Sequence, residues 1–257
     1  MNKIKENLPA IADLVTEAAG ISLAYWNSGD PKVSITKKPD GSDVTEVDLK
    51  MDAVLREGLQ NLFPDEVIIT EETFDPAVKA TSAWIVDPLD GTTSFLEGND
   101  DFAILLAYIK DHQPIFGLMC FPAQDLSIAC FRDEGIGGVQ DLKLSQSELL
   151  EPNSVYTSRF EPVPSQKLYQ EKPHSGKALL EFFRGNLDGI ILKDFGIWDH
   201  APAALIAESL GGCVTNGAGQ PYVYLKEGGS DNIICFSNGK DACHLELLTL
   251  IPEDLIN

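Results

Sequence analysis

The most constraining feature of this chain is the stretch from residue 84 to residue 95. It consists of a short apolar run, then two aspartates three positions apart, Asp87 and Asp90, and then Gly91-Thr92-Thr93. Carboxylates at the end of a strand can converge on a hard cation. The free backbone N–H groups of Gly91 and Thr92, at the start of a helix, can hold a phosphate beside it. A metal and an anion bound side by side would suit hydrolysis of a phosphate ester.

The length and composition indicate an ordinary globular protein. The chain has 257 residues, enough for one large α/β domain or two closely packed halves. No apolar run approaches the roughly 18 residues that cross a bilayer, and the N-terminus has no signal-peptide core. The five cysteines are scattered and odd in number, which predicts buried reduced thiols. We therefore expect a cytoplasmic protein that does not associate with membranes.

The charge of the chain limits its partners. The formal net charge is −21, from 19 basic and 40 acidic side chains. Such a surface repels nucleic acid and anionic membranes, so neither is an expected partner. It would also repel a phosphorylated substrate, unless bound divalent metal reverses the field locally.

Periodicity predicts alternating helices and strands in the first half of the chain. The expected helices cover 4–25 and about 45–62, and the expected strands cover 67–70 and 83–86. Residues 33–36 and 43–45 flank a turn-rich segment, which predicts a hairpin with a mobile tip. Three further apolar runs, at 102–109, 114–121 and 126–131, predict an antiparallel meander.

The second half of the chain alternates in the same way after a polar join. Residues 140–175 contain four prolines and are expected to be irregular. Helices are then predicted at about 176–185, 201–210 and 240–250, with strands at 189–192, from Cys213, and at 232–236. The expected fold is a layered α/β sandwich, in which halves 1–140 and 141–257 form one compact unit.

Five acidic residues stand where an element ends or begins: Asp48, Glu71, Asp87, Asp90 and Asp199. A single carboxylate at such a position usually caps a helix. Several together, with little lysine or arginine nearby, are better explained by a shared cation, because crowded carboxylates repel one another. Cysteine is missing near these acids and the histidines are unpaired, which favours Mg²⁺ or Mn²⁺ over zinc.

Four segments carry a family resemblance: 41–48, 70–72, 84–95 and 198–201. Together they resemble the inositol monophosphatase family of magnesium-dependent, lithium-sensitive phosphatases, from the first helix to the last. The resemblance implies an αβαβα five-layer sandwich of the inositol monophosphatase / fructose-1,6-bisphosphatase type, usually assembled as a homodimer. It also implies two to three bound Mg²⁺ ions, with Mn²⁺ as a substitute and with Li⁺ and Ca²⁺ as inhibitors.

The resemblance further implies a role for each acidic residue. Glu71, Asp87 and the Leu89 carbonyl would hold a first metal, and Asp87, Asp90 and Asp199 a second. A third, weaker ion would lie near Glu71 and Asp48. The amides of Gly91 and Thr92 would bind the ester phosphate, while Thr92, hydrogen-bonded to Asp48, would orient the attacking water. The implied catalytic residues are thus Glu71, Thr92 and Asp48.

The substrate is less constrained by the sequence. The segment from Ser175 resembles a family stretch that faces the substrate, with Lys177 in place of a small residue. The predicted substrate contacts are Asp90, Gly91, Thr92, Ser175, Gly176, Lys177 and His200. Lys177 is either a solvated charge or a cation for a second phosphate, and His200 either lines the pocket or caps a helix.

A small phosphorylated metabolite is the expected partner, with inositol-1-phosphate as the first choice. Alternatives are a 3′(2′),5′-bisphosphate nucleotide and a fructose-1,6-bisphosphatase-like activity. A non-catalytic regulatory binding protein on a phosphatase fold is the alternative of another class. The retained set Glu71, Asp87, Asp90, Thr92 and Asp199 argues against that last reading.

Overall fold

The apolar runs of the first half pair into one six-stranded sheet. The computed structural model describes residues 2–26, 34–37, 43–137, 142–159, 167–169, 173–226 and 231–256. The strands lie in chain order: β3 (Ile68–Thr70), β4 (Ala83–Asp90), β5 (Ala103–Lys110), β6 (Gln113–Phe121), β7 (Leu126–Phe131) and β8 (Gly135–Gly137). Strand β3 is parallel to β4, and the others form an antiparallel meander, which confirms that prediction. Every residue of β4 is buried, because both faces of the sheet are covered.

A second, four-stranded sheet forms from the later part of the chain. Its order is β11 (Cys213–Asn216), β12 (Ile233–Ser237), β10 (Gly189–Lys193) and β9 (Val155–Ser158). Strand β9 lies parallel to β10, and the other pairs are antiparallel. The sheet is therefore mixed, with β9 at one edge.

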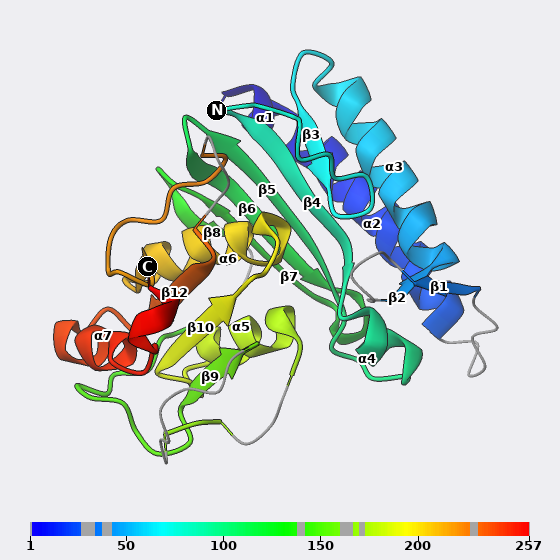
Figure 1. Ribbon diagram of the computed structural model, residues 1–257. Helices are drawn as coiled ribbons and strands as arrows, with labels where there is room; N and C mark the ends of the chain where they lie inside the picture. The colour runs from blue at the N-terminus through cyan, green and yellow to red at the C-terminus, as the bar shows by residue number, and fades with distance from the viewer. Residues whose placement is uncertain are drawn as a thin grey trace.

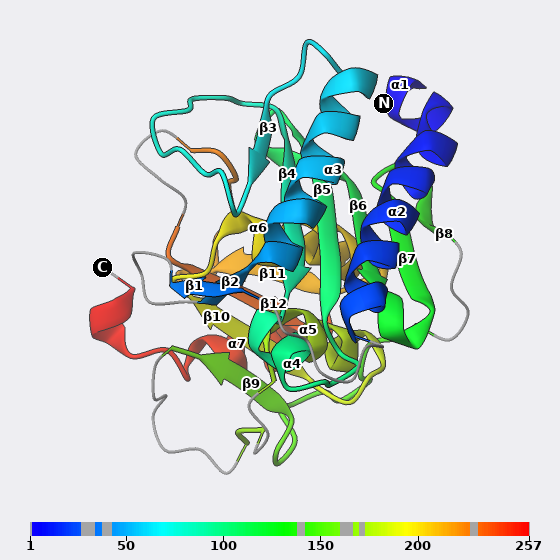
Figure 2. The same cartoon turned by 90° about the vertical axis from the view of Figure 1, so that its right-hand side faces the viewer.

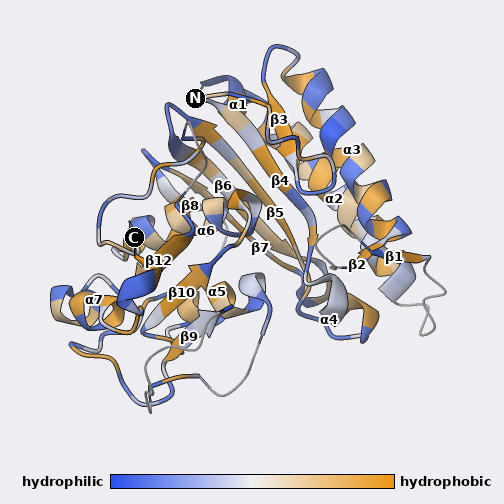
Figure 3. Cartoon of the chain, in the orientation of Figure 1, coloured by the Kyte–Doolittle hydropathy of each residue, from blue (hydrophilic) through white to orange (hydrophobic). Residues whose placement is uncertain are grey.

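Helices cover both sheets and separate them, as Figures 1 and 2 show. On the outer face of the six-stranded sheet lie α2 (Leu8–Trp26) and α3 (Glu46–Leu62). Between the sheets lie α5 (Ser175–Phe183) and α6 (Ile197–Ser209), and α7 (Asp241–Leu248) packs on the far side of the second sheet. This order of layers confirms the predicted αβαβα sandwich. The strands and the inner helix faces are its apolar interior (Figure 3).

Short elements complete the chain: α1 (Asn2–Glu6), β1 (Ile35–Lys37), β2 (Asp43–Thr45), α4 (Thr92–Leu96), and the 3₁₀ turns η1 (Pro122–Gln124) and η2 (Glu253–Leu255). Strands β1 and β2 pair antiparallel, which confirms the predicted hairpin for those residues. The predicted mobile tip and residue 33 lie outside the described residues.

The structure corrects several predicted boundaries. The first helix is interrupted at Asn7, because Pro9 has no N–H to donate and its ring disfavours a continuous helix. Strand β9 lies in the join that was predicted to be irregular, and β8 was not predicted. Helix α6 begins at Ile197, so Asp199 lies in its first turn and not before it.

Helix α2 requires a second correction, concerning membranes. It has 19 residues, and by length and composition alone it meets the criterion for a membrane-spanning helix, contrary to the expectation from sequence. This is weak evidence, since core helices pass the same test. Its Ile11, Val15 and Ala18 are buried against the rest of the chain, and Asp13 and Glu17 lie in its middle.

Candidate active site

Strand β4 presents two carboxylates on one side because its register shifts near its end. Asp87 pairs with Leu105 and Asp90 with Ala103, so three steps along β4 match two along β5. Pro88 lies within this bulge, where no ladder N–H is needed. The amide of Leu89 donates to Asp87 Oδ1 at 3.0 Å, which holds the bulge in shape. Without the bulge, the odd spacing would send Asp87 and Asp90 to opposite faces.

A third carboxylate reaches these two from the middle helical layer. Asp199 lies in the first turn of α6, and its amide donates to the Gly196 carbonyl at 3.1 Å. One oxygen from each of Asp87, Asp90 and Asp199 lies within 4.8 Å of the others. The helix that follows β10 thus meets the end of β4, and residues 112 positions apart in sequence form one cluster (199 − 87).

The electrostatics of the cluster call for a cation. Burial is the main reason that the pKa of Asp87 is raised well above its usual value, and the charges of Glu71, Asp90 and Asp199 raise it further. Burial and the charges of Asp90 and Glu71 likewise raise the pKa of Asp199. Carboxylates crowded in this way are costly when ionised and unpaired. A hard divalent ion relieves both the burial and the repulsion, so these oxygen donors fit the predicted metal.

Glu71 follows β3 directly and lies close enough to influence the other ligands. Its amide donates to the Val86 carbonyl of β4 at 3.0 Å, so β3 and β4 place it beside Asp87. The carbonyl oxygen of Leu89, another predicted ligand, lies 3.2 Å from Thr92 Oγ1. The three residues predicted to hold the first metal, Glu71, Asp87 and Leu89, therefore lie at the neighbouring ends of β3 and β4.

The predicted Asp48–Thr92 pair is present. Thr92 Oγ1 donates to Asp48 Oδ1 at 3.0 Å, joining the start of α4 to the start of α3. The other oxygen, Asp48 Oδ2, accepts from the Thr45 amide at 2.9 Å and from the Thr45 hydroxyl, in a capping box at the start of α3. Burial raises the pKa of Asp48, although these hydrogen bonds oppose the rise.

Gly91 forms the turn between β4 and α4. Its φ of 83° is in the left-handed region, and a Cβ there would come within 2.8 Å of His174 Nε2. Only glycine therefore fits, for a backbone reason and a steric one.

The start of α5 closes on Asp90. Ser175 Oγ donates to Asp90 Oδ1 at 2.8 Å, and the Gly176 amide donates to Asp90 Oδ2 at 2.8 Å. A Cβ at residue 176 would lie 2.2 Å from Asp90 Oδ2, so glycine allows this approach. Ser175 Oγ also lies 3.4 Å from Asp199 Oδ1. The predicted substrate residues Ser175 and Gly176 thus contact carboxylates that are predicted to bind metal.

The other two predicted substrate residues, Lys177 and His200, contact Asp101 and two tyrosines, respectively. Lys177 Nζ forms an ion pair with Asp101 Oδ2 at 2.9 Å. His200 is buried, its ring contacts those of Tyr222 and Tyr224, and burial lowers its pKa to about 3. Its Nδ1 lies 3.2 Å from the Tyr224 hydroxyl. The structure therefore packs His200 in the core with two tyrosines and not with the carboxylate cluster.

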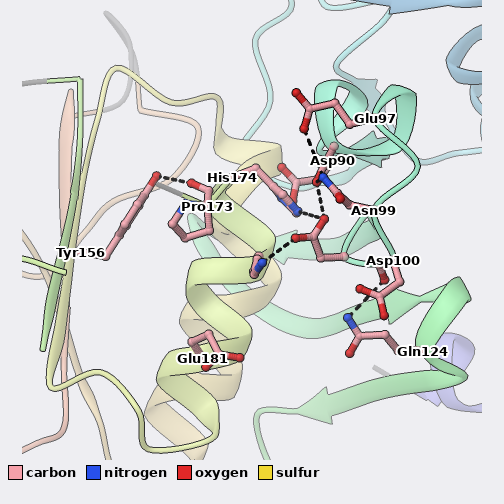
Figure 4. Close-up of polar contacts among 12 residues, drawn as sticks. Asp90, Glu97, Asn99, Asp100, Gln124, Tyr156, Pro173, His174 and Glu181 are labelled. Carbon is pink, nitrogen blue, oxygen red and sulfur yellow. Dashed lines mark hydrogen bonds and ion pairs between the residues drawn. The ribbon is translucent and has the colours of Figure 1, made fainter. Parts of the chain in front are cut away.

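Sequence reasoning missed His174 and Asp101. His174 Nδ1 lies 2.7 Å from Asp90 Oδ2, and its Nε2 lies 3.5 Å from Asp101 Oδ1 (Figure 4). Burial alone would lower the pKa of His174, but the two carboxylates raise it to about 10. Burial would raise the pKa of Asp90, yet His174 and the hydrogen bonds from α5 lower it. The only signal in the sequence was that His174 directly precedes Ser175 and Gly176.

Comparison with known proteins agrees with this geometry. The sequence profile of the inositol monophosphatase family matches residues 5–246. The 3′(2′),5′-bisphosphate nucleotidase CysQ of Buchnera aphidicola is 28% identical over 84% of this chain and 86% of its own. The fructose-1,6-bisphosphatase/inositol-1-monophosphatase of Thermotoga maritima is 26% identical over 93% of both chains.

A solved IMPase/NADP phosphatase, complexed with Mg²⁺ and phosphate, has the same fold. The TM-score is 0.80 at 19% identity, covering 97% of this chain and 96% of that one. A profile match over nearly the whole chain, and a carboxylate cluster at the end of β4, lead to one assignment. The chain belongs to the inositol monophosphatase family and is a metal-dependent phosphatase of that type.

Proposed function

We propose that this chain is a Mg²⁺-dependent phosphomonoesterase that acts on a small phosphorylated metabolite, with inositol-1-phosphate as the first candidate. The observation that carries the proposal is the convergence of Asp87, Asp90 and Asp199 within 4.8 Å, beside the Thr92–Asp48 pair. The solved relative that carries Mg²⁺ and phosphate supports the choice of metal. Two to three ions, with Mn²⁺ as a substitute, remain the proposed complement.

The proposed roles of the residues follow from their positions. Glu71, Asp87 and the Leu89 carbonyl would hold one ion, and Asp87, Asp90 and Asp199 another. When bound, such ions activate water and stabilise the charge that develops on phosphate oxygens. The Gly91 and Thr92 amides would bind the phosphate, with Ser175 and Gly176 beside it. Thr92 Oγ1 donates to Asp48, so its lone pairs remain able to accept a hydrogen bond from water and orient that water for attack.

A second candidate is a bisphosphorylated substrate, such as a 3′(2′),5′-bisphosphate nucleotide. The CysQ relative supports it, and so does Arg159. The guanidinium of Arg159 stacks over Phe195, 4.4 Å from the ring centroid, just before α6. Burial and the charges of Asp90 and Glu71 raise the pKa of Asp199, whereas Arg159 is the cation that opposes them. Lys177 is a weaker candidate for a second phosphate, since Asp101 already neutralises it.

Phosphate release tests the proposal. The substrates are inositol-1-phosphate, fructose 1,6-bisphosphate, histidinol phosphate and 3′-phosphoadenosine 5′-phosphate, each with Mg²⁺, with EDTA, and with Mg²⁺ plus Li⁺ or Ca²⁺. We expect release only with Mg²⁺, and inhibition by Li⁺ and Ca²⁺. Asp90→Asn should lower kcat/KM by at least about 100-fold, which corresponds to about 3 kcal/mol of lost transition-state stabilisation.

Arg159→Met separates the two candidate substrates. If the substrate is a bisphosphate, this change should raise KM for it about 10-fold, and inositol-1-phosphate should be unaffected. Full turnover in EDTA would refute the metal-dependent mechanism. No release from any substrate would instead favour a non-catalytic binding role. Light scattering tests the proposed homodimer, and cell fractionation tests the proposed cytoplasmic location.

A further inference from the structure

His174 directly precedes α5, but its side chain does not cap that helix. It is the N-cap residue of α5, but its side chain accepts no hydrogen bond from that helix. The cap comes from Asp90 on β4, which accepts from the Gly176 amide. The His174 ring reaches the same carboxylate, and Figure 4 shows the two side chains pointing toward each other.

We propose that His174 is a positioning residue: its Nδ1 fixes the Asp90 carboxylate, and its ring fixes the Gly91 turn beside it. The inference rests on the proposed metal site, because Asp90 is one of the ligands that site needs. It adds a residue that touches neither metal nor substrate but decides where a ligand and a phosphate-binding amide lie.

Three hydrogen bonds fix the orientation of the Asp90 carboxylate. Oδ2 accepts from His174 Nδ1 at 2.7 Å and from the Gly176 amide at 2.8 Å, whereas Oδ1 accepts from Ser175 Oγ at 2.8 Å. A carboxylate held by one donor per oxygen can still tilt about its own axis. The third donor, on the side of Oδ2, removes that freedom and leaves Oδ1 with spare capacity to bind a cation.

The ring of His174 also packs against Gly91. A Cβ at Gly91 would lie 2.8 to 2.9 Å from three atoms of the His174 ring. The ring therefore rests on the left-handed turn whose amides are proposed to bind phosphate. Holding that turn and Asp90 with one ring couples the anion site to the metal site.

Contacts on the other side explain why the ring stays in place. Asp101 Oδ1 lies 3.5 Å from Nε2, and Asp101 is itself held by Ser94 Oγ and by Lys177 Nζ. Nε2 makes no hydrogen bond within the described part of the chain. The carbonyl of Pro173, the residue before His174, accepts from the Tyr156 hydroxyl at 2.7 Å. The directional contact of the ring is thus the one through Nδ1.

The two ring nitrogens allow a sharp test. In His174→Asn the amide nitrogen takes the place of Nδ1, whereas in His174→Gln it takes the place of Nε2. Mn²⁺ affinity of the metal-stripped protein is measured by titration calorimetry for these variants and for His174→Ala. Thermal unfolding without metal shows that each variant is folded.

We expect His174→Ala and His174→Gln to weaken Mn²⁺ binding about 10- to 100-fold, the usual effect of removing a partner that orients a ligand. His174→Asn should stay within about 3-fold of the wild type, because it keeps the donor to Asp90. His244→Ala is the matched control: it removes another buried histidine, which contacts Thr215 and Ser237, and should leave Mn²⁺ affinity unchanged.

A folded His174→Ala protein with wild-type Mn²⁺ affinity would overturn the proposal. If His174→Ala does not fold, the Asn and Gln variants decide, and equal affinities in that pair would overturn it. A wild type that binds no Mn²⁺ would refute the metal site as well. A wild type that binds Mn²⁺ and shows this pattern but releases no phosphate would refute only the proposed substrate chemistry, and would support the role of His174.

Discussion

At the scale of single residues, the site depends on close approaches that larger side chains would prevent. Gly176 lets Asp90 Oδ2 reach the backbone of α5, and Gly91 lets the His174 ring lie on the turn before α4. Asp48 and Thr92 are joined by one 3.0 Å hydrogen bond across two helix starts. The geometry of the site therefore depends on the missing Cβ atoms of Gly91 and Gly176 as well as on the acidic side chains.

Gly91→Ala should lower kcat/KM by at least about 10-fold and destabilise the fold. The new Cβ meets the His174 ring, and the left-handed backbone adds about 1–2 kcal/mol of strain. Gly98→Ala is the control, since Gly98 has a φ of 79° but nothing within 4 Å of its Cβ position. Urea unfolding and steady-state kinetics compare the two. Equal effects would show that backbone strain, and not the contact with His174, explains the loss.

At the scale of elements, α6 approaches the six-stranded sheet very closely. A Cβ on Gly117 of β6 would lie 2.8 Å from the Pro202 carbonyl oxygen and 2.9 Å from its Cα. The same helix carries Asp199 in its first turn. The close packing of α6 against β6 therefore also determines the position of Asp199 relative to Asp87 and Asp90.

Gly117→Ala should destabilise the protein by about 1–3 kcal/mol, because backbone must move to admit the methyl group. In a chain of this size each kcal/mol lowers Tm by about 2–4 °C. Gly137→Ala, in β8 of the same sheet, has open space around its Cβ position and should have little effect. Calorimetric melting of both variants measures the difference, and comparable Tm values would contradict the tight contact.

At the scale of the whole molecule, the five layers depend on contacts that bury polar groups away from the site. His244 of α7 links its helix to the second sheet, with Nδ1 2.9 Å from Ser237 Oγ and Nε2 3.1 Å from Thr215 Oγ1. Burial lowers its pKa below 6.5, and nearby Asp241 opposes that effect only weakly. The outermost layer is therefore attached through a histidine whose neutral form is favoured by burial.

The pH dependence of unfolding tests this attachment. Because the folded pKa of His244 is depressed, the unfolded chain binds the proton first as the pH falls below 6.5. The stability that His244 contributes is thus present above pH 6.5 and is lost below it, down to its folded pKa. Urea unfolding of wild type and His244→Gln, from about pH 5 to about pH 8, should show a steeper acid loss in the wild type. Parallel curves would contradict the assignment.

The sequence predicted those parts of the fold that rest on local periodicity. Helix α3 and the meander of β5, β6 and β7 have clear apolar periods, and the structure confirms them. Strand β9 could not be seen, because it pairs parallel to β10 from within a proline-containing segment. Its residues Val155, Tyr156 and Thr157 do favour a strand, but a run of four residues is too short to be recognised from periodicity alone.

The candidate site divides in the same way. Asp87, Asp90 and Asp199 were found because they stand at element ends within recognisable motifs. His174 and Asp101 belong to no motif, and they lie beside Asp90 only because the start of α5 packs against the end of β4. Such a contact depends on how distant elements pack in the folded chain, and a single sequence does not show that packing.

The position of the carboxylates also has a consequence for the order of folding. Asp87 and Asp90 belong to a sheet whose neighbouring strands are close in sequence, whereas Asp199 arrives with α6 from beyond β10. Contacts between residues so far apart in sequence form slowly. The carboxylate cluster is therefore completed only after α6 has packed on the six-stranded sheet. During synthesis, the ion site of Asp87, Asp90 and Asp199 would then be completed later than the proposed site of Glu71, Asp87 and the Leu89 carbonyl, whose residues are close in sequence.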